Sequence, residues 1–409
     1  MNKNIKLAVA GAVLALGATA ANAGIIIPAG EWTVDLSGNV NAFMSTTRNT
    51  GDNAVAGGLA MPNNTGTKNA NTISTGLLPN FLSVAGSSRQ NDLDVTFLIS
   101  INPGGFSSNS ASGGSGTEHR QAFMTFGDKS WGSIKIGKDL GIYASDAILS
   151  DMTLLGVGAS AGAPLGTTTL GGIGTGYQYA DWKQQSAYTT PNMGGFQATV
   201  GATQAWNAWS TTGTDGLYEN GAGSAVLSGV SSQRAAGSPA FEGKASYSFT
   251  GSDVTGKVWV SAFGQKVKGI GSGDTVWSAD IGANVNAGGF GVTGYYYTGE
   301  GTGTTFLLAD AFSTDYKKRD VDGGYVQATY VLPTKTKIGA SYGISNLDRA
   351  GNDSANALVK SNERYTVGVY HPLTKSVNLV AEYNSTESEA QSGVTGKAKG
   401  VSLGGILFF

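Results

Sequence analysis

The sequence predicts an all-β protein, a transmembrane antiparallel β-barrel of about 16 strands. Three observations carry this prediction: segments in which apolar and polar residues alternate, an export signal with no later apolar helix, and a last segment that ends on aromatic residues. Strands of a membrane barrel alternate lipid-facing and lumen-facing residues, and closure of the barrel leaves no unpaired edge in the lipid.

The composition narrows the class of protein. The chain has 409 residues, 63 glycines, no cysteine and a formal net charge of −2. Disulfides therefore play no part, and a near-neutral chain offers no basic field for nucleic acid. The two histidines, His119 and His371, lie in no recognisable arrangement with a nucleophile and an acid, so we expect no enzyme activity. We also expect no metal site and no cofactor.

The N-terminus has the form of an export signal. Lys3 and Lys6 precede an apolar stretch over 7–16, and Ala21-Asn22-Ala23 has the A-x-A form of a cleavage site. We expect residues 1–23 to be a removed secretory signal peptide and residues 24–409 to form the barrel domain. No later segment approaches the roughly 18 uninterrupted apolar residues of a transmembrane helix. An exported chain without such a helix is periplasmic, secreted or an outer-membrane barrel, and the alternating segments and the aromatic C-terminus favour the outer membrane.

Alternating segments follow along the chain. Residues 31–43 place Trp32, Val34 and Val40 on one face and acidic or amide residues on the other. Residues 92–101 alternate most clearly, and long polar loops, such as 46–75 and 204–238, are expected to contain no strand. Short turns join further strand pairs, and we expect these pairs at 119–138, 185–203, 241–267, 275–298, 323–344 and 364–383.

Residues 139–181 form the longest insertion without a convincing strand. A loop of this length is usually functional or disordered. This one contains apolar residues such as Ile142, Leu149 and Leu154, which need a packed environment. The inside of a wide barrel offers one, so we expect this loop to fold inward.

The C-terminal segment alternates up to the last residue. Val401, Leu403, Leu407 and Phe409 share one face, which is the face expected to meet lipid. This pattern resembles the C-terminal membrane-insertion signature of Gram-negative outer-membrane barrels, which end in a phenylalanine.

Three stretches together resemble one family, the general (non-specific) trimeric porins of Gram-negative bacteria. They are Val34–Asn39, the pair of segments between Arg120 and Asp139, and the hairpin Ser186–Phe196. The resemblance implies a homotrimer of 16-stranded barrels in outer-membrane lipid and lipopolysaccharide. Each barrel would hold a water-filled pore for ions and small hydrophilic solutes, narrowed by an inward-folded third extracellular loop at about 139–181.

The resemblance also implies a pore constriction in which acids of the loop face bases of the wall. By position, Asp151 corresponds to a loop acid, Asp146 lies just before it, and Arg120 corresponds to a wall base. The remaining candidate bases are Lys135, Lys138 and Lys183. Opposed charges across a narrow channel orient water and polar solutes. The loop lacks the family's Pro-Glu-Phe-Gly-Gly motif, which leaves the ion preference open.

Two alternative functions stay open at this point. A channel specific for a sugar or an organic acid would use aromatic residues along the pore. The candidates for such a row are Trp206, Trp209, Trp259, Trp277 and Tyr295–Tyr297, but the same residues suit lipid-facing girdles. A structural or adhesive barrel would instead use the long loops to bind partners.

Overall fold

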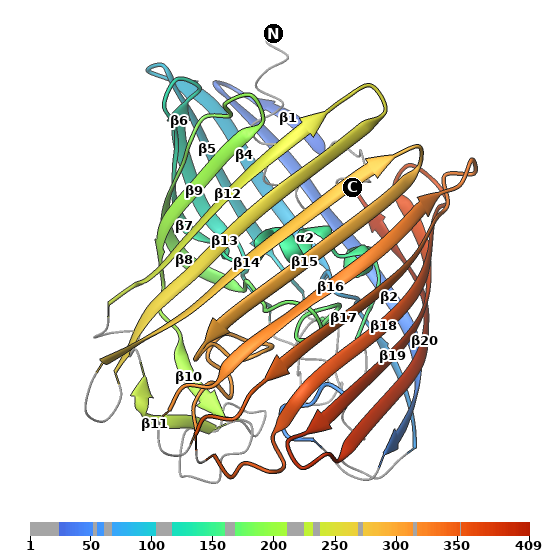
Figure 1. Ribbon diagram of the computed structural model, residues 1–409. Coiled ribbons are helices and arrows are strands. Elements are labelled where there is room, and N and C mark those ends of the chain that lie inside the picture. The colour runs from blue at the N-terminus through green and yellow to red at the C-terminus, as the bar shows by residue number, and fades with distance from the viewer. Residues whose placement is uncertain are drawn as a thin grey trace.

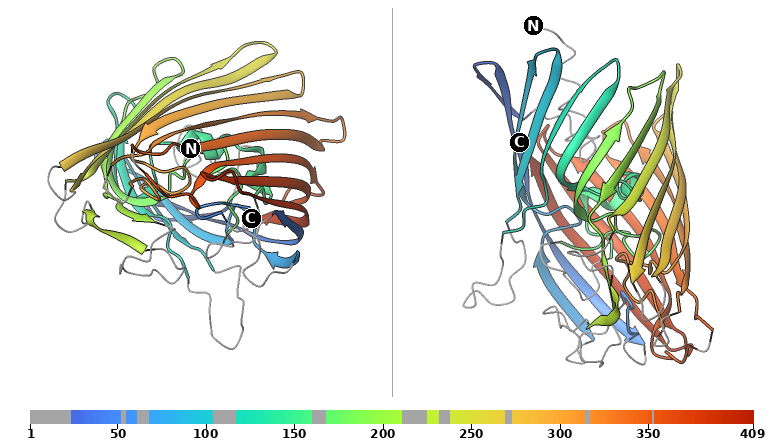
Figure 2. Two further views of the ribbon diagram at one scale, coloured as in Figure 1. Left: turned by 60° about the horizontal axis from the view of Figure 1, so that its bottom comes forward. Right: turned by 90° about the vertical axis from the view of Figure 1, so that its left-hand side faces the viewer.

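The computed structural model describes residues 24–51, 55–60, 68–103, 117–159, 168–210, 225–231, 238–268, 273–313, 317–351 and 353–409. They form one antiparallel sheet that closes into a barrel (Figures 1 and 2). Closure occurs where the last strand, β20 (Thr395–Phe408), pairs with β2 (Trp32–Gly51). The expected signal peptide lies outside the described residues.

Sixteen strands form the closed wall, which confirms the predicted fold class. They are β2, β4 (Phe81–Gln90), β5 (Leu93–Ile101), β6 (Ala122–Asp128), β7 (Gly132–Leu140), β8 (Trp182–Thr189), β9 (Phe196–Thr203), β12 (Ala240–Thr250), β13 (Val254–Lys268), β14 (Gly273–Ala287), β15 (Phe290–Glu300), β16 (Asp320–Val331), β17 (Lys337–Leu347), β18 (Val359–Pro372), β19 (Val377–Ala390) and β20.

Four shorter strands extend the sheet. β1 (Ile25–Ala29) and β3 (Asn69–Ser74) pair with β2, and β10 (Asn207–Ser210) pairs with β11 (Ala225–Ser231). The prediction of no strand within 46–75 and 204–238 was therefore wrong. In β2 the residues after 45 are polar on both faces, so the apolar alternation that marks a membrane strand is missing there.

The alternation of side chains matches a barrel with a lipid-facing outer surface. Val40 and Leu403 point outward and are 59% and 56% exposed, whereas the neighbouring Asn41 and Ser402 point inward and are buried. Beyond β20, the backbone N–H of Phe409 donates to the Gly38 carbonyl oxygen at 3.1 Å, and the Gly38 N–H donates to that of Phe409 at 3.0 Å. Among the described residues, no helix has the length and apolar character needed to cross a membrane.

A charge on the outer surface should destabilise the barrel. We expect Leu403→Arg to lower the free energy of unfolding by about 2–4 kcal/mol, the cost of an arginine facing the middle of the lipid. Leu403→Met, which conserves volume and polarity, is the matched control. Urea titrations of the protein refolded into lipid vesicles measure both, and equal midpoints for the two variants would contradict a lipid-facing position.

Candidate functional site: the inward loop and the cavity beside it

The described residues of the segment 141–181, called here the inward loop, lie within the barrel (Figures 1 and 2). Its described part carries a short helix, α2 (Ser145–Ser150), and a 3-10 turn, η2 (Met152–Leu155). Both place apolar side chains in buried clusters with wall residues. The apolar residues that predicted an inward position are thus the ones that pack there.

A wall carboxylate holds the start of the inward loop. Glu242 Oε2 on β12 accepts the backbone N–H groups of Ile142 at 2.7 Å and Tyr143 at 2.8 Å. Its other oxygen accepts from Lys183 Nζ at 2.5 Å and from Thr203 Oγ1 at 3.0 Å. Glu242 is buried, and every partner donates to its charge, which is the condition under which a buried carboxylate is tolerated.

A second carboxylate holds the inward loop after η2. Glu382 Oε2 on β19 accepts the backbone N–H groups of Val157 at 3.0 Å and Gly158 at 2.8 Å, and Tyr370 Oη donates to Oε1 at 2.7 Å. Position 156, just before Val157, requires glycine, because a Cβ on Gly156 would lie 1.9 Å from Glu382 Oε1.

Between these anchors the wall bonds to the helical part of the inward loop. Gln327 on β16 accepts from the Met152 N–H at 2.9 Å and donates to the Ser150 carbonyl oxygen at 2.6 Å. Tyr325 Oη, also on β16, donates to the Ala147 carbonyl oxygen at 2.9 Å. The inward loop is therefore fixed against the inner wall from β12 to β19.

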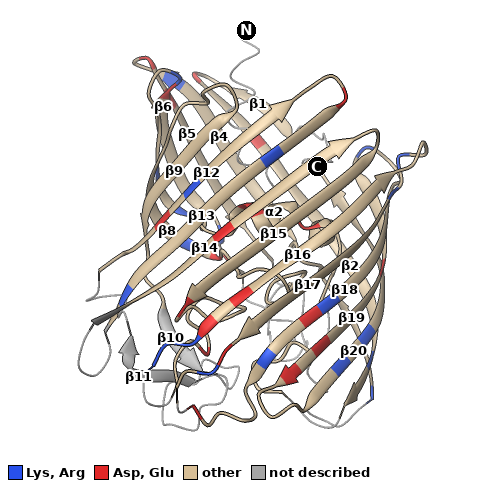
Figure 3. Ribbon diagram, viewed as in Figure 1, with Lys and Arg blue, Asp and Glu red and all other residues tan. Residues whose placement is uncertain are grey.

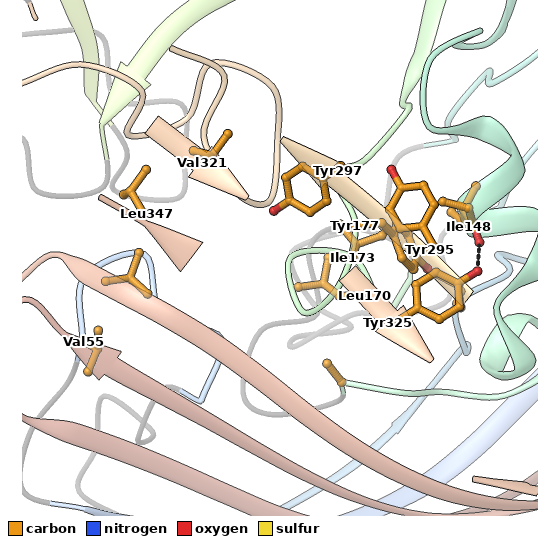
Figure 4. Close-up of a cluster of buried hydrophobic side chains, with 14 of the residues drawn as sticks. Val55, Ile148, Leu170, Ile173, Tyr177, Tyr295, Tyr297, Val321, Tyr325 and Leu347 are labelled. Atoms are coloured by element: carbon orange, nitrogen blue, oxygen red, sulfur yellow. Dashed lines mark hydrogen bonds between the residues drawn. The ribbon is translucent and has the colours of Figure 1, made fainter. Parts of the chain in front are cut away.

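Buried tyrosines fill the space between the inward loop and the wall (Figure 4). The rings of Tyr177 and Tyr325 meet edge to face with centroids 5.7 Å apart, and Tyr295 packs 5.6 Å from Tyr325. Tyr297 is buried in the same cluster, whereas Tyr296 points outward. These inward tyrosines support the inward loop; they form neither an aromatic row along a pore nor a lipid-facing girdle.

The two candidate acids of the loop both face the wall. Asp146 in α2 pairs with Lys257 and, at 3.2 Å, with Lys244. Burial alone would raise the pKa of Asp146, but the attraction of Lys244 and Lys257 outweighs it and holds this pKa below its usual range. The pair therefore persists in mild acid.

Asp151 lies deeper in the structure. Its Oδ1 accepts the Thr153 N–H at 2.8 Å, its Oδ2 accepts from Tyr177 Oη at 2.8 Å, and Arg364 Nη2 on β18 lies 3.8 Å from Oδ2. Asp151 thus caps η2 and ties the inward loop to β18.

The candidate bases separate into two groups. Arg120 and Lys138 line one cavity, called here the side cavity, whose volume is about 410 Å³. Lys135 pairs with Asp139 on the same strand, and Lys183 is buried against Glu242. Neither Asp146 nor Asp151 lines the side cavity, so the structure does not bring the candidate acids and Arg120 together.

The side cavity lies between the inward loop and the ends of the short strands β4 to β8. Two acids that the sequence did not single out face its bases: Glu118 Oε2 accepts from Arg120 Nε at 2.9 Å, and Asp181 lies near Arg120 and Lys138. Burial raises the pKa of Asp181, although these neighbouring cations oppose the shift. Apolar side chains also line the side cavity, among them Leu77, Leu78, Phe81, Leu149, Leu154 and Leu170.

Sequence reasoning missed the residues that hold the inward loop. Glu242, Lys244, Lys257 and Glu382 stand at lumen-facing positions of predicted strands, which the alternation alone identifies. The alternation carries no information on which lumen-facing positions meet a loop from elsewhere in the chain. Within the described residues, no group of three or more His, Asp or Glu side chains lies together as a metal site requires.

Comparisons with known proteins agree with this architecture. A family model described as Gram-negative porin matches residues 8–391. A search of curated proteins found no match. The fold is similar to that of the outer membrane channel DcaP of Acinetobacter baumannii, with a TM-score of 0.69 and 16% identity over 95% of this chain and 100% of that chain.

Two further solved structures share the fold. The anion-selective porin from Comamonas acidovorans has a TM-score of 0.60 and 15% identity, over 93% of this chain and 100% of that chain. A trimer form of OmpT, an outer membrane protein of Vibrio cholerae, has a TM-score of 0.51 and 14% identity, over 92% and 99%.

The family match extends over most of the chain and confirms the resemblance that the three stretches and the terminal pattern indicated. The closed barrel of sixteen strands is the architecture of that family. The chain belongs to the Gram-negative porin family and is an outer-membrane channel for passive diffusion.

Proposed function

We propose that ions and small hydrophilic solutes pass this barrel beside the inward loop, through the side cavity, without a cofactor or an energy source. One observation carries the proposal: the inward loop is fixed along the wall from β12 to β19, and the side cavity stays open between the loop and β4 to β8. A barrel that bonds its backbone between strands can enclose such a polar route.

The charges of the side cavity support a narrow, polarised passage. Arg120, Lys138, Glu118 and Asp181 line this cavity together with apolar side chains, and Arg120 pairs directly with Glu118 at 2.9 Å. Between walls of low dielectric constant, opposed charges act more strongly than in water and orient the solutes that pass. We propose that these four residues create the transverse electric field of the constriction. The other candidate residues, Asp146, Asp151, Lys135 and Lys183, instead stabilise the inward loop and the wall.

We propose that the mature protein is a homotrimer, exported with its signal peptide removed and surrounded by outer-membrane lipid and lipopolysaccharide. The trimer form of the similar OmpT structure supports the assembly. The A-x-A site at Ala21–Ala23 supports the processing. The exposed apolar face of Val40, Met44 and Leu403 supports contact with lipid acyl chains.

Single-channel recording in a planar lipid bilayer tests the channel directly. We expect large current steps in groups of three, unaffected by added sugars or organic acids. Block by one such solute at low concentration would instead favour a substrate-specific channel. Folded protein without any conductance would contradict the diffusion pore and favour an adhesive or structural barrel.

A further inference from the structure

Two like charges stand directly opposite each other on the outer surface of the barrel. Arg48 on β2 and Lys399 on β20 are cross-strand partners, and both are exposed; they are called here the cationic pair. Arg48 shares the outward series of β2 with Met44, and Lys399 shares that of β20 with Leu403. Like charges at directly opposed positions destabilise a sheet, so the cationic pair costs stability unless an anion lies beside it.

The acids near the cationic pair are bonded elsewhere. Among the residues that the structure describes, neither member of the pair forms an ion pair with a carboxylate. The acids of β18 and β19 on this part of the wall have other partners: Glu387 pairs with Lys397 at 2.7 Å, Glu389 pairs with Lys360 at 2.9 Å, and Glu363 accepts from Tyr342 Oη at 3.0 Å. The cationic pair therefore lacks a counter-charge from the described part of the chain.

The cationic pair borders the apolar outer face. The next outward residue of β20 is Val401, which is exposed, and Tyr383 stands opposite it on β19 and is exposed as well. Exposed tyrosines are typical of the level at which lipid headgroups meet the apolar band. Figure 3 shows charged positions of β18 to β20 toward the lower ends of these strands, where the long loops lie. In barrels of this class the long loops face the outside, so the pair lies at the level of the outer headgroups.

We propose that the cationic pair binds a phosphate group of lipopolysaccharide, the phosphorylated lipid of the outer leaflet. The inference rests on the proposed surroundings of the barrel, because it names one contact with that lipid. The planar guanidinium of Arg48 can hold two phosphate oxygens, and Lys399 adds a second positive charge. A phosphate held there removes the repulsion within the pair, and the acyl chains of the same lipid lie along Val401, Met44 and Leu403.

Native mass spectrometry of the detergent-solubilised protein, titrated with diphosphoryl lipid A, tests the site. We expect Arg48→Gln/Lys399→Gln to weaken binding by about thirtyfold, which is about 2 kcal/mol for the two charges. The matched control is Lys360→Gln, which removes a lysine that is 52% exposed and paired with Glu389, and it should leave the affinity unchanged. Equal affinities of the double variant and the wild type, or an equal loss in the control, would overturn the site.

Arg48→Glu provides a second test that does not depend on the double variant. Glutamate opposite Lys399 replaces two like charges with an ion pair, so we expect equal or higher thermal stability together with a loss of lipid A binding. A folded Arg48→Glu variant that binds lipid A as the wild type does would contradict the site. Inorganic phosphate separates the lipid from a free anion: displacement of lipid A by an equal concentration of phosphate would show that the acyl chains contribute nothing, and would overturn a lipid site.

Further outcomes separate the lipid site from the channel. The cationic pair lies on the outer surface, so the single-channel conductance of the variants should equal that of the wild type. A conducting wild type that binds no lipid A would overturn the lipid site and leave the porin function intact. Binding of lipid A by folded protein without conductance would overturn the passage and support the site. A double variant that leaves the trimer but keeps its lipid affinity would show that the pair faces a second copy of the chain, which also overturns the site.

Discussion

Glu382→Ala is expected to release the second half of the inward loop and to raise the single-channel conductance. The substitution removes the acceptor of the Val157 and Gly158 N–H groups and of Tyr370 Oη, and leaves these donors buried without it. Hydrogen bonds to a charged group contribute about 1.5–3 kcal/mol each to stability, so we expect the loss of these three bonds to free this part of the inward loop. Planar-bilayer recording measures the conductance and its fluctuation.

The matched control for this prediction is Glu382→Gln. Glutamine keeps one carbonyl oxygen for the two backbone N–H groups, and its amide can donate to Tyr370 Oη, so we expect conductance close to that of the wild type. A thermal melt shows whether the barrel of each variant is intact. Equal conductance of the alanine variant and the wild type, with both barrels folded, would show that Glu382 does not hold the inward loop.

The wall of the barrel could be predicted from the sequence because lipid imposes a period of two. Val40 and Leu403 must face outward and Asn41 and Ser402 inward, and the alternation records this directly. The prediction failed where the strand leaves the lipid, as at the end of β2. Residues on both faces of the strand are polar there, so the sequence shows no apolar alternation. The apolar content of 139–181 likewise indicated that this segment needs a packed environment.

The contacts of the inward loop could not be predicted in the same way. Asp151 and Asp146 both stand in the predicted segment, but their partners Tyr177, Lys244 and Lys257 depend on how the backbone turns at each step. Ala144 and Asp181 adopt positive φ angles of 57° and 52°. Neither turn could be predicted from the type of residue at these positions. The resemblance to the family placed the two acids by position along the chain, but it could not identify Lys244, Lys257 and Arg364 as the wall bases that they meet.

The second large effect concerns a buried ion pair between the segment before β16 and the segment before β18. Arg319 Nε lies 2.6 Å from Asp353 Oδ2, and Arg319 Nη1 donates to the Asp310 carbonyl oxygen at 2.8 Å. Both charged side chains are almost completely covered. We expect Asp353→Ala to destabilise the packing of these segments by about 3–5 kcal/mol, because it leaves a buried guanidinium without its counter-charge. Limited proteolysis of the folded barrel measures the opening of the segments.

Acid should weaken the same contact in the wild type. Burial alone would raise the pKa of Asp353, but the hydrogen bond and charge of Arg319 outweigh it and hold this pKa below its usual range. The folded state therefore binds the proton less readily than the unfolded state, so the stabilisation is complete above the usual aspartate range and is lost as pH falls through the lowered pKa. We expect cleavage of the segments by an acid-active protease to accelerate at low pH in the wild type.

The control for this pH effect is Arg319→Met/Asp353→Leu, which replaces both charges with apolar side chains of similar size. A buried pair exchanged as a whole often costs little stability, so this variant should resist proteolysis near neutral pH. It should also lose the part of the acid sensitivity that comes from Asp353. Identical pH profiles for the double variant and the wild type would show that other carboxylates control the acid opening.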